Sequence, residues 1–251
     1  MKSLLTLLIF TSILVLSIGQ IKAQIVTDRP DQTESSSTVG KGNLQIEAGL
    51  LIRFAGEDEN AVRQILAPTT LFRYGITEGI ELRLLSQLES IKIQDQVAQG
   101  ISDIEVGAKI QLFQKEESRF EVAFLSHLLV PTGSENLSFE SFGTINKLAV
   151  SQEINETLGL GYNLGYNYFG RGSGMLTYSA VLGVGVNDKV AIYVEPYGEL
   201  VDMEEFVLNF DAGLTYLVKD NLQLDFSFGT GLTHRMNYIS LGCCWKIMKA
   251  S

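Results

Sequence analysis

Cysteine and histidine are scarce in this chain of 251 residues, which has two of each. The cysteines, Cys243 and Cys244, are adjacent, and neighbours on a strand point to opposite faces, so the sequence predicts no disulfide framework. His127 and His234 stand alone, without the Cys/His spacing of a metal site. We therefore expect neither a bound metal nor a cofactor.

Basic residues are outnumbered, with 19 Lys and Arg against 29 Asp and Glu, and the formal net charge is −10. An acidic surplus of this size argues against nucleic acid as a partner, because the phosphate backbone would be repelled. The partners that remain are membrane lipid, other proteins and small solutes.

Long apolar runs are absent after residue 18. The one such run, Leu4 to Ile18, follows Lys2 and precedes a more polar stretch ending in Ala23. This pattern is typical of a secretory signal peptide, so we expect residues 1–23 to be cleaved off. The alternative is an uncleaved membrane helix, for which the run falls short of the roughly 20 apolar residues required. Any crossing of a membrane by the mature chain must therefore use strands.

The sequence is rich in alternation between apolar and polar residues. In 44–50, 80–84, 104–112 and 222–228 every second residue is apolar, which is the period of a strand with one apolar face. Weaker copies bring the total to about twelve segments of roughly 10–13 residues, a length that spans the apolar band of an outer-membrane barrel when tilted. The pattern predicts an all-β fold over residues 43–251: a transmembrane antiparallel up-and-down β-barrel of about 12 strands.

A soluble sandwich or lipocalin-like barrel would show the same alternation with its apolar face turned inward. The connections favour the membrane barrel, because tight turns alternate with longer loops, as they do when all tight turns lie on the periplasmic side. We expect the longer loops near 55–63, 88–101, 131–141, 170–174, 201–205 and 231–236.

In a membrane barrel the polar face of each strand lines the lumen. The charged residues on that face are the candidates for the lumen lining: Glu47, Arg53, Arg73, Glu81, Arg83, Glu105, Lys109, Glu121, Glu195, Glu199, Asp211 and Asp225.

Catalytic motifs are also lacking. Ser126 and His127 are the only adjacent Ser/His pair, but neighbours on a strand face opposite ways, and no Gly-x-Ser-x-Gly elbow exists. We assign no catalytic residue and predict that the protein is not an enzyme. An outer-membrane acyl hydrolase stays as an alternative.

Residues 24–42 are polar, have little periodicity and precede the first strand. They form either a disordered leader or a plug that enters the lumen, where their charges would pair with the mixed charges of the wall. The plug candidates are Asp28, Arg29, Pro30, Asp31 and Glu34.

This opening resembles that of the transporter-like barrels known as the "putative meta-pathway of phenol degradation" family. Three motifs carry the resemblance: Asp28-Arg29-Pro30, Thr33-Glu34-Ser35 and the Gly-x-x-Gln-x-Glu-x-Gly strand from Gly42 to Gly49. The rest of the mature chain is similar only loosely, and Gly40 stands where the family usually has proline. The resemblance implies an outer-membrane channel or transporter, in some cases encoded beside pathways for aromatic compounds, and supplies no binding residues to carry over.

Together these observations predict a channel or transporter that passes a small solute, aromatic or polar, across the outer membrane of a two-membraned bacterium. Its other partners would be outer-membrane lipid and the barrel-insertion machinery, since the final segment, 238–247, resembles a closing strand with Trp245 near its end. The alternative is a non-transporting structural or interaction barrel.

Overall fold

The computed structural model describes residues 25–115 and 118–249, and the predicted signal peptide lies outside them. Within this part of the chain there is one short 3-10 helix, η2 (Asp58–Asn60), and no helix that is long and apolar enough to cross a membrane. The strands are β1 (Leu44–Ala55), β2 (Val62–Thr77), β3 (Ile80–Ile93), β4 (Gln96–Ile101), β5 (Ile104–Lys115), β6 (Ser118–Val130), β7 (Gly143–Glu153), β8 (Leu158–Tyr168), β9 (Met175–Gly185), β10 (Val190–Val201), β11 (Glu205–Lys219), β12 (Leu222–Gly231) and β13 (Met236–Ile247).

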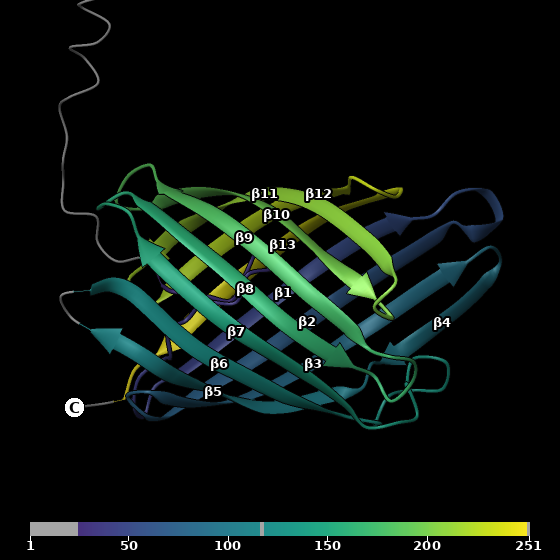
Figure 1. Ribbon diagram of the computed structural model, residues 1–251, viewed down its shortest axis with the longest axis horizontal. Coiled ribbons are helices and arrows are strands. Elements are labelled where there is room, and N and C mark those ends of the chain that lie inside the picture. The colour runs from purple at the N-terminus through teal and green to yellow at the C-terminus, as the bar shows by residue number, and fades with distance from the viewer. Residues whose placement is uncertain (1–24, 116–117, 250–251) are drawn as a thin grey trace, which may run out of the picture.

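The strands close into an antiparallel barrel (Figure 1). β1 pairs with both β2 and β13, which joins the two ends of the sheet. β3 pairs with β5 through residues 80–85 and with β4 through residues 88–93. β4 and β5 therefore share one position in the wall, interrupted at Ser102 and Asp103. The ring has twelve positions, and the predicted up-and-down barrel of about twelve strands is confirmed.

The two faces of the wall differ in polarity. On β3, Leu82 and Leu84 point outward and are 49% and 39% exposed, whereas Glu81 and Arg83 point inward and are 0% and 3% exposed. Large hydrophobic side chains form the outer surface around the ring in the same way. An apolar belt of this extent is matched to acyl chains rather than to water. The barrel is therefore of the outer-membrane type, and the predicted outer-membrane localisation is confirmed.

Segment 88–101 is a hairpin and not the polar loop that we expected. It is made by the outer part of β3 and by β4, and Figure 1 shows it projecting, with hairpin β1–β2, beyond the remaining strands. Its residues include Ile91, Ile93 and Val97, whose β-branched side chains favour strands. Gln94, at a φ of 53°, supplies the turn. The loop was predicted because this stretch also contains many polar residues.

The connection after β10 was also expected to be long, at 201–205, and it is tight. Only residues 202–204 separate β10 from β11. Asp202 and Met203 have φ values of 49° and 63°, as in the two-residue turns that match the twist of a hairpin. Met is not a typical turn residue, so residue types alone do not predict this turn. The alternation of long and short connections therefore has exceptions at the end with the longer loops.

We expect that end to face the outside of the cell. In a background where Cys243 and Cys244 are serine, single cysteines at Asn60 and Ser173 should react with an impermeant maleimide on intact cells, because both positions are exposed near the longer loops. A cysteine at Asn187, in the exposed turn before β10, should react only after cell lysis. Equal labelling of the two groups in intact cells would refute this orientation.

Candidate functional site

Residues 25–42, called the leader from here on, lie inside the barrel. Ile25 packs with Leu217 and Cys244, and the N–H of Gly42 donates to the carbonyl of Gly75 at 2.8 Å. Between these points the leader bonds to lumen-facing side chains on β1, β2, β3, β5, β6, β8, β9, β10, β12 and β13. It is therefore attached to most of the wall, and the attachments are mainly polar.

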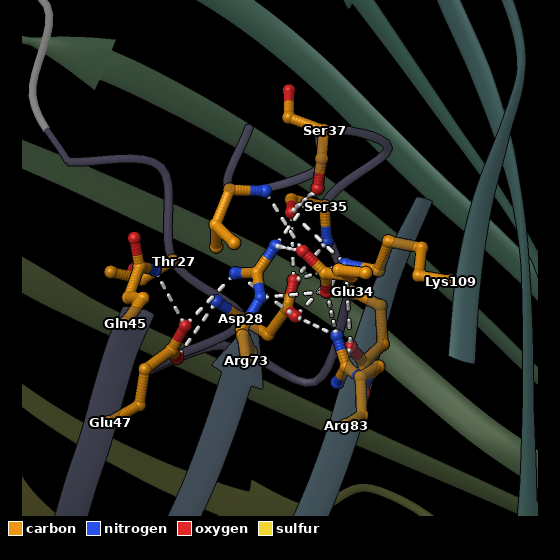
Figure 2. A network of polar contacts seen from close by, with 12 residues as sticks. Thr27, Asp28, Glu34, Ser35, Ser37, Gln45, Glu47, Arg73, Arg83 and Lys109 are labelled. Atoms are coloured by element: carbon orange, nitrogen blue, oxygen red, sulfur yellow. Dashed lines mark hydrogen bonds and ion pairs between the residues drawn. The ribbon is translucent and has the colours of Figure 1, made fainter. Parts of the chain in front are cut away.

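Asp28 is the centre of the densest set of contacts (Figure 2). Its carboxylate lies 2.5 Å from Arg83 Nη1, 2.9 Å from Lys109 Nζ and 3.2 Å from Arg73 Nη1. It also accepts hydrogen bonds from the main-chain N–H and the hydroxyl of Ser35 at 2.8 Å. The three cations come from neighbouring wall positions, β2, β3 and β5, so the register of the sheet assembles a basic site for one acid.

The charge state of Asp28 follows from this site. Burial alone would raise the pKa of the Asp28 carboxyl, but the charges of Arg73, Lys109 and Arg83 outweigh it and hold that pKa well below its usual range. Because the pKa is depressed in the docked leader, the contact stabilises docking above the ordinary pKa of Asp. That stabilisation is lost as the pH falls through the depressed value.

The same cations also bind other carboxylates. Arg73 reaches Glu81 at 2.8 Å and Glu47 at 2.9 Å, and Arg83 reaches Glu34 of the leader at 2.8 Å. Buried charges are stable only when they are paired, and removing one partner typically costs about 3–5 kcal/mol. We call this set the ionic cluster: Asp28, Glu34, Glu47, Arg73, Glu81, Arg83 and Lys109.

The opposite side of the lumen holds the leader through acids. The N–H of Gln32 donates to Glu195 at 2.7 Å, and the hydroxyl of Thr33 donates to the other oxygen of the same carboxylate. Thr33 also shares a hydrogen bond of 2.6 Å with the hydroxyl of Ser179. Glu195 faces Asp211 across the β10–β11 pair. Within the leader, Asp28 thus lies among cations, whereas Gln32 and Thr33 lie among carboxyl groups.

Asp31 lies on this acidic side. Burial raises the pKa of its carboxyl well above the usual range, and the neighbouring carboxylates Glu195 and Asp211 raise it further. A raised pKa means that the docked leader holds this proton more tightly than the free leader does. Docking is therefore favoured below the ordinary pKa of Asp and weakens as the pH rises toward the raised value.

Arg29 occupies a niche made by two glycines. Its Nη2 lies 3.1 Å from Asp225 and 2.9 Å from the hydroxyl of Ser240. The guanidinium rests on Gly49 and Gly242, which are cross-strand partners on β1 and β13. A Cβ atom at these positions would lie 2.4 Å and 2.6 Å from guanidinium atoms. A side chain at either position would therefore require the Arg29 guanidinium to shift from its present place.

The remaining candidates of the lumen lining divide into two groups. Glu105 accepts from His127 at 2.7 Å, and Glu121 accepts from the hydroxyls of Ser36 and Ser37 at 3.1 Å. Arg53 and Glu199 lie on inward-facing positions near the end of the barrel that carries the longer loops. No ion pair joins them to the leader in the described part of the chain. Among the plug candidates, Pro30 is buried.

Sequence reasoning missed the uncharged residues of the site. Asn163 on β8 accepts from the N–H of Glu34 at 2.7 Å and donates to its carbonyl at 3.0 Å. Ser179 was missed in the same way, and Thr33 was named only as part of a sequence motif. For Asn163 and Ser179 the only signal was the polar phase of the strand alternation, which the selection of charged residues ignored.

A cavity of about 260 Å³ lies beside the leader, on the side toward the longer loops. Leu71, Leu85 and Ile145 form an apolar part of its lining, and Lys147 and Asn167 lie at its polar part, with Arg29, Glu34, Arg83, Glu105 and His127. Across residues 25–115 and 118–249, no group of three or more His, Cys, Asp or Glu side chains is arranged to hold a metal ion. The cavity therefore offers ion pairs, hydrogen bonds and apolar contact.

Comparison with known proteins gives one family and one fold. The model of a family described as "Putative MetA-pathway of phenol degradation" matches residues 27–240. No curated protein matches.

Among solved structures, the KdgM porin is similar at a TM-score of 0.57 and 13% identity, over 81% of this chain and 99% of that one. The KdgM porin in complex with disordered oligogalacturonate gives 0.56 and 15%, over 81% and 99%. The CymD monoaromatic hydrocarbon channel gives 0.47 and 11%, over 84% and 90%. At 13% and 15% sequence identity, the likeness to the two KdgM structures shows a shared barrel fold.

Proposed function

Because the chain belongs to the family described as "Putative MetA-pathway of phenol degradation", we propose that it is an outer-membrane channel for a small solute and that the leader closes its lumen. A barrel of about twelve strands has room for a narrow lumen, between filled eight-stranded barrels and open porins. Here the leader takes up that room. The domain division that we propose is a signal peptide at 1–23, a plug at 24–42 and a barrel at 43–251.

The observation that carries this proposal is the polar character of the leader's attachment. Its main contacts are ion pairs and hydrogen bonds to a charged wall, such as Asp28 on Arg83 and Lys109. Water and ions can replace contacts of this kind, whereas an apolar core would have no substitute in an open state. The barrel wall is closed by its own strand pairing, so the leader can leave without opening the ring.

The second candidate is a barrel in which the leader is a permanent core and nothing passes. The extent of the attachment, to ten strands, is what favours it. An acyl hydrolase has little support, because His127 bonds to Arg83 and Glu105 in the lumen while Ser126 bonds to Asn146 on the other face.

A reversible tether separates the two candidates. The hydroxyls of Thr33 and Ser179 are 2.6 Å apart, so cysteines at both positions are within reach of a disulfide. In a background where Cys243 and Cys244 are serine, the oxidised barrel should stay closed in a planar bilayer and a reductant should restore openings. The single variants Thr33→Cys and Ser179→Cys are the controls, and the reductant should not change their channel openings. Absence of openings in the reduced and untethered proteins would favour the permanent core.

A further inference from the structure

The cavity beside the leader has the size and lining of a binding site for one small molecule. An engineered apolar cavity of about 150 Å³ holds benzene, so a cavity of about 260 Å³ has room for one ring with a polar substituent. Leu71, Leu85 and Ile145 provide apolar contact for the ring. Among the described residues, the Oδ1 atom of Asn167 is buried without a hydrogen-bond partner, which leaves an acceptor in the lining for a donor such as water.

Lys147 is the loosely paired cation of this cavity. Each cation of the ionic cluster has a carboxylate oxygen within 2.9 Å: Arg73 has Glu81, and Arg83 and Lys109 both have Asp28. Within residues 25–115 and 118–249, the one carboxylate near Lys147 Nζ is that of Glu34, whose Oε1 lies at 3.9 Å, beyond hydrogen-bond distance.

The stem of Lys147 lies against Gly165, its cross-strand partner on β8. A Cβ atom at Gly165 would lie 2.9 Å from Lys147 Cγ. The stem of the lysine thus packs on the glycine, while no carboxylate oxygen of the described residues lies closer than 3.9 Å to its ammonium group.

Glu34 already presents a carboxylate to this place. Its two oxygens lie 2.8 Å from Arg83 Nη2 and 3.9 Å from Lys147 Nζ, and its side chain is 17% exposed. Its main chain is fixed separately, by the two hydrogen bonds to Asn163. The side chain can therefore swing away from Arg83 while the leader stays docked.

We propose that the cavity binds a small organic carboxylate, which takes the place of the Glu34 side chain on Arg83 and Lys147. The inference rests on the proposed channel and names its class of solute. Exchange of one carboxylate for another leaves the number of charges around Arg83 unchanged, so no buried cation loses its partner. A neutral solute that displaced Glu34 would leave Arg83 and Lys147 short of negative charge, and a cationic one would add repulsion.

Calorimetric titration of the full mature barrel, folded in detergent, tests the site with three probes of similar size: benzoate, benzyl alcohol and benzylammonium. Benzoate should bind at least about tenfold more tightly than the other two, as expected for a charge-assisted contact. Lys147→Met should weaken benzoate binding about tenfold, and Lys147→Arg should preserve it. Glu34→Gln should tighten benzoate binding, because it removes the internal competitor. Lys189→Met, which removes the same charge in an exposed turn, should leave the affinity unchanged.

Equal affinity for benzoate and benzyl alcohol would overturn the inference, and so would wild-type benzoate affinity in a folded Lys147→Met barrel. Heat-dependent migration on gels shows whether each variant has folded. This binding experiment needs no open channel, so its result is distinct from that of the tether. If benzoate binds as described and the untethered barrel never opens, the carboxylate site stands and the channel proposal fails.

Discussion

A barrel that lacks residues 25–40 is expected to fold and to conduct about tenfold more ionic current than the full mature chain, because the lumen is then filled with water and mobile ions. The wall keeps its strand pairing, since every pairing of the ring involves residues from Leu44 onward. The deletion also removes Asp28 and Glu34 from the ionic cluster. Water replaces them around Arg83 and Lys109, which limits the cost of leaving these cations without partners. Single-channel recording in planar bilayers measures the change.

The matched control is a full-length chain with Asp28→Asn. It keeps the length of the leader and removes the charge that three cations share. We expect intermediate behaviour, with the leader leaving the lumen more often and channel openings becoming more frequent. If the deletion leaves the conductance unchanged, the leader does not obstruct the pathway and the proposal of a plug is wrong.

Leu84→Arg is expected to impair folding into bilayers, with a loss of roughly 2–4 kcal/mol for a charge on the lipid face near the midplane. Leu84 lies well inside β3, and its side chain is 39% exposed on the outer surface. Folding yields from urea into lipid vesicles, read from heat-dependent migration on gels, measure the effect.

The neighbouring variant Arg83→Leu is the control for position along the strand. It faces the lumen, and it leaves Asp28, Glu34 and Glu81 short of a cation. We expect the barrel to form and the leader to loosen, so that conductance rises. Normal folding of Leu84→Arg would mean that this face does not lie in acyl chains.

The wall of this barrel was predictable because the sequence of each strand by itself shows which side chains face lipid. The alternation of Glu81 and Arg83 with Leu82 and Leu84 decides which side faces lipid, whatever the neighbouring strand is. Prediction from local sequence was wrong where the backbone conformation is one that the residue types do not favour, as in the tight turn at Asp202 and Met203. It was wrong again on 88–101, where polar residues lie on a hairpin that projects from the rim.

The candidate site was predictable only in its charges. The mixed charge of the opening segment suggested that it could pair with the wall, but the sequence holds no information on which partners meet. Asp28 meets Arg83 because β2, β3 and β5 bring their cations side by side in register. Thr33 meets Ser179 across 146 positions of the chain. Such contacts depend on the closed ring, which periodicity implies without fixing its register.

The site of the leader also fixes an order of events during assembly. Arg29 docks on Gly49 of β1 and on Gly242 of β13, a surface that does not exist until the first and last strands of the barrel have paired. Docking of Arg29, in the segment that precedes every strand of the chain, therefore follows closure of the ring. The contacts of Arg29 span as many as 212 positions, and closing loops of this length is slow. Newly assembled barrels should thus pass through a stage in which the ring is complete and the leader is not yet fully docked.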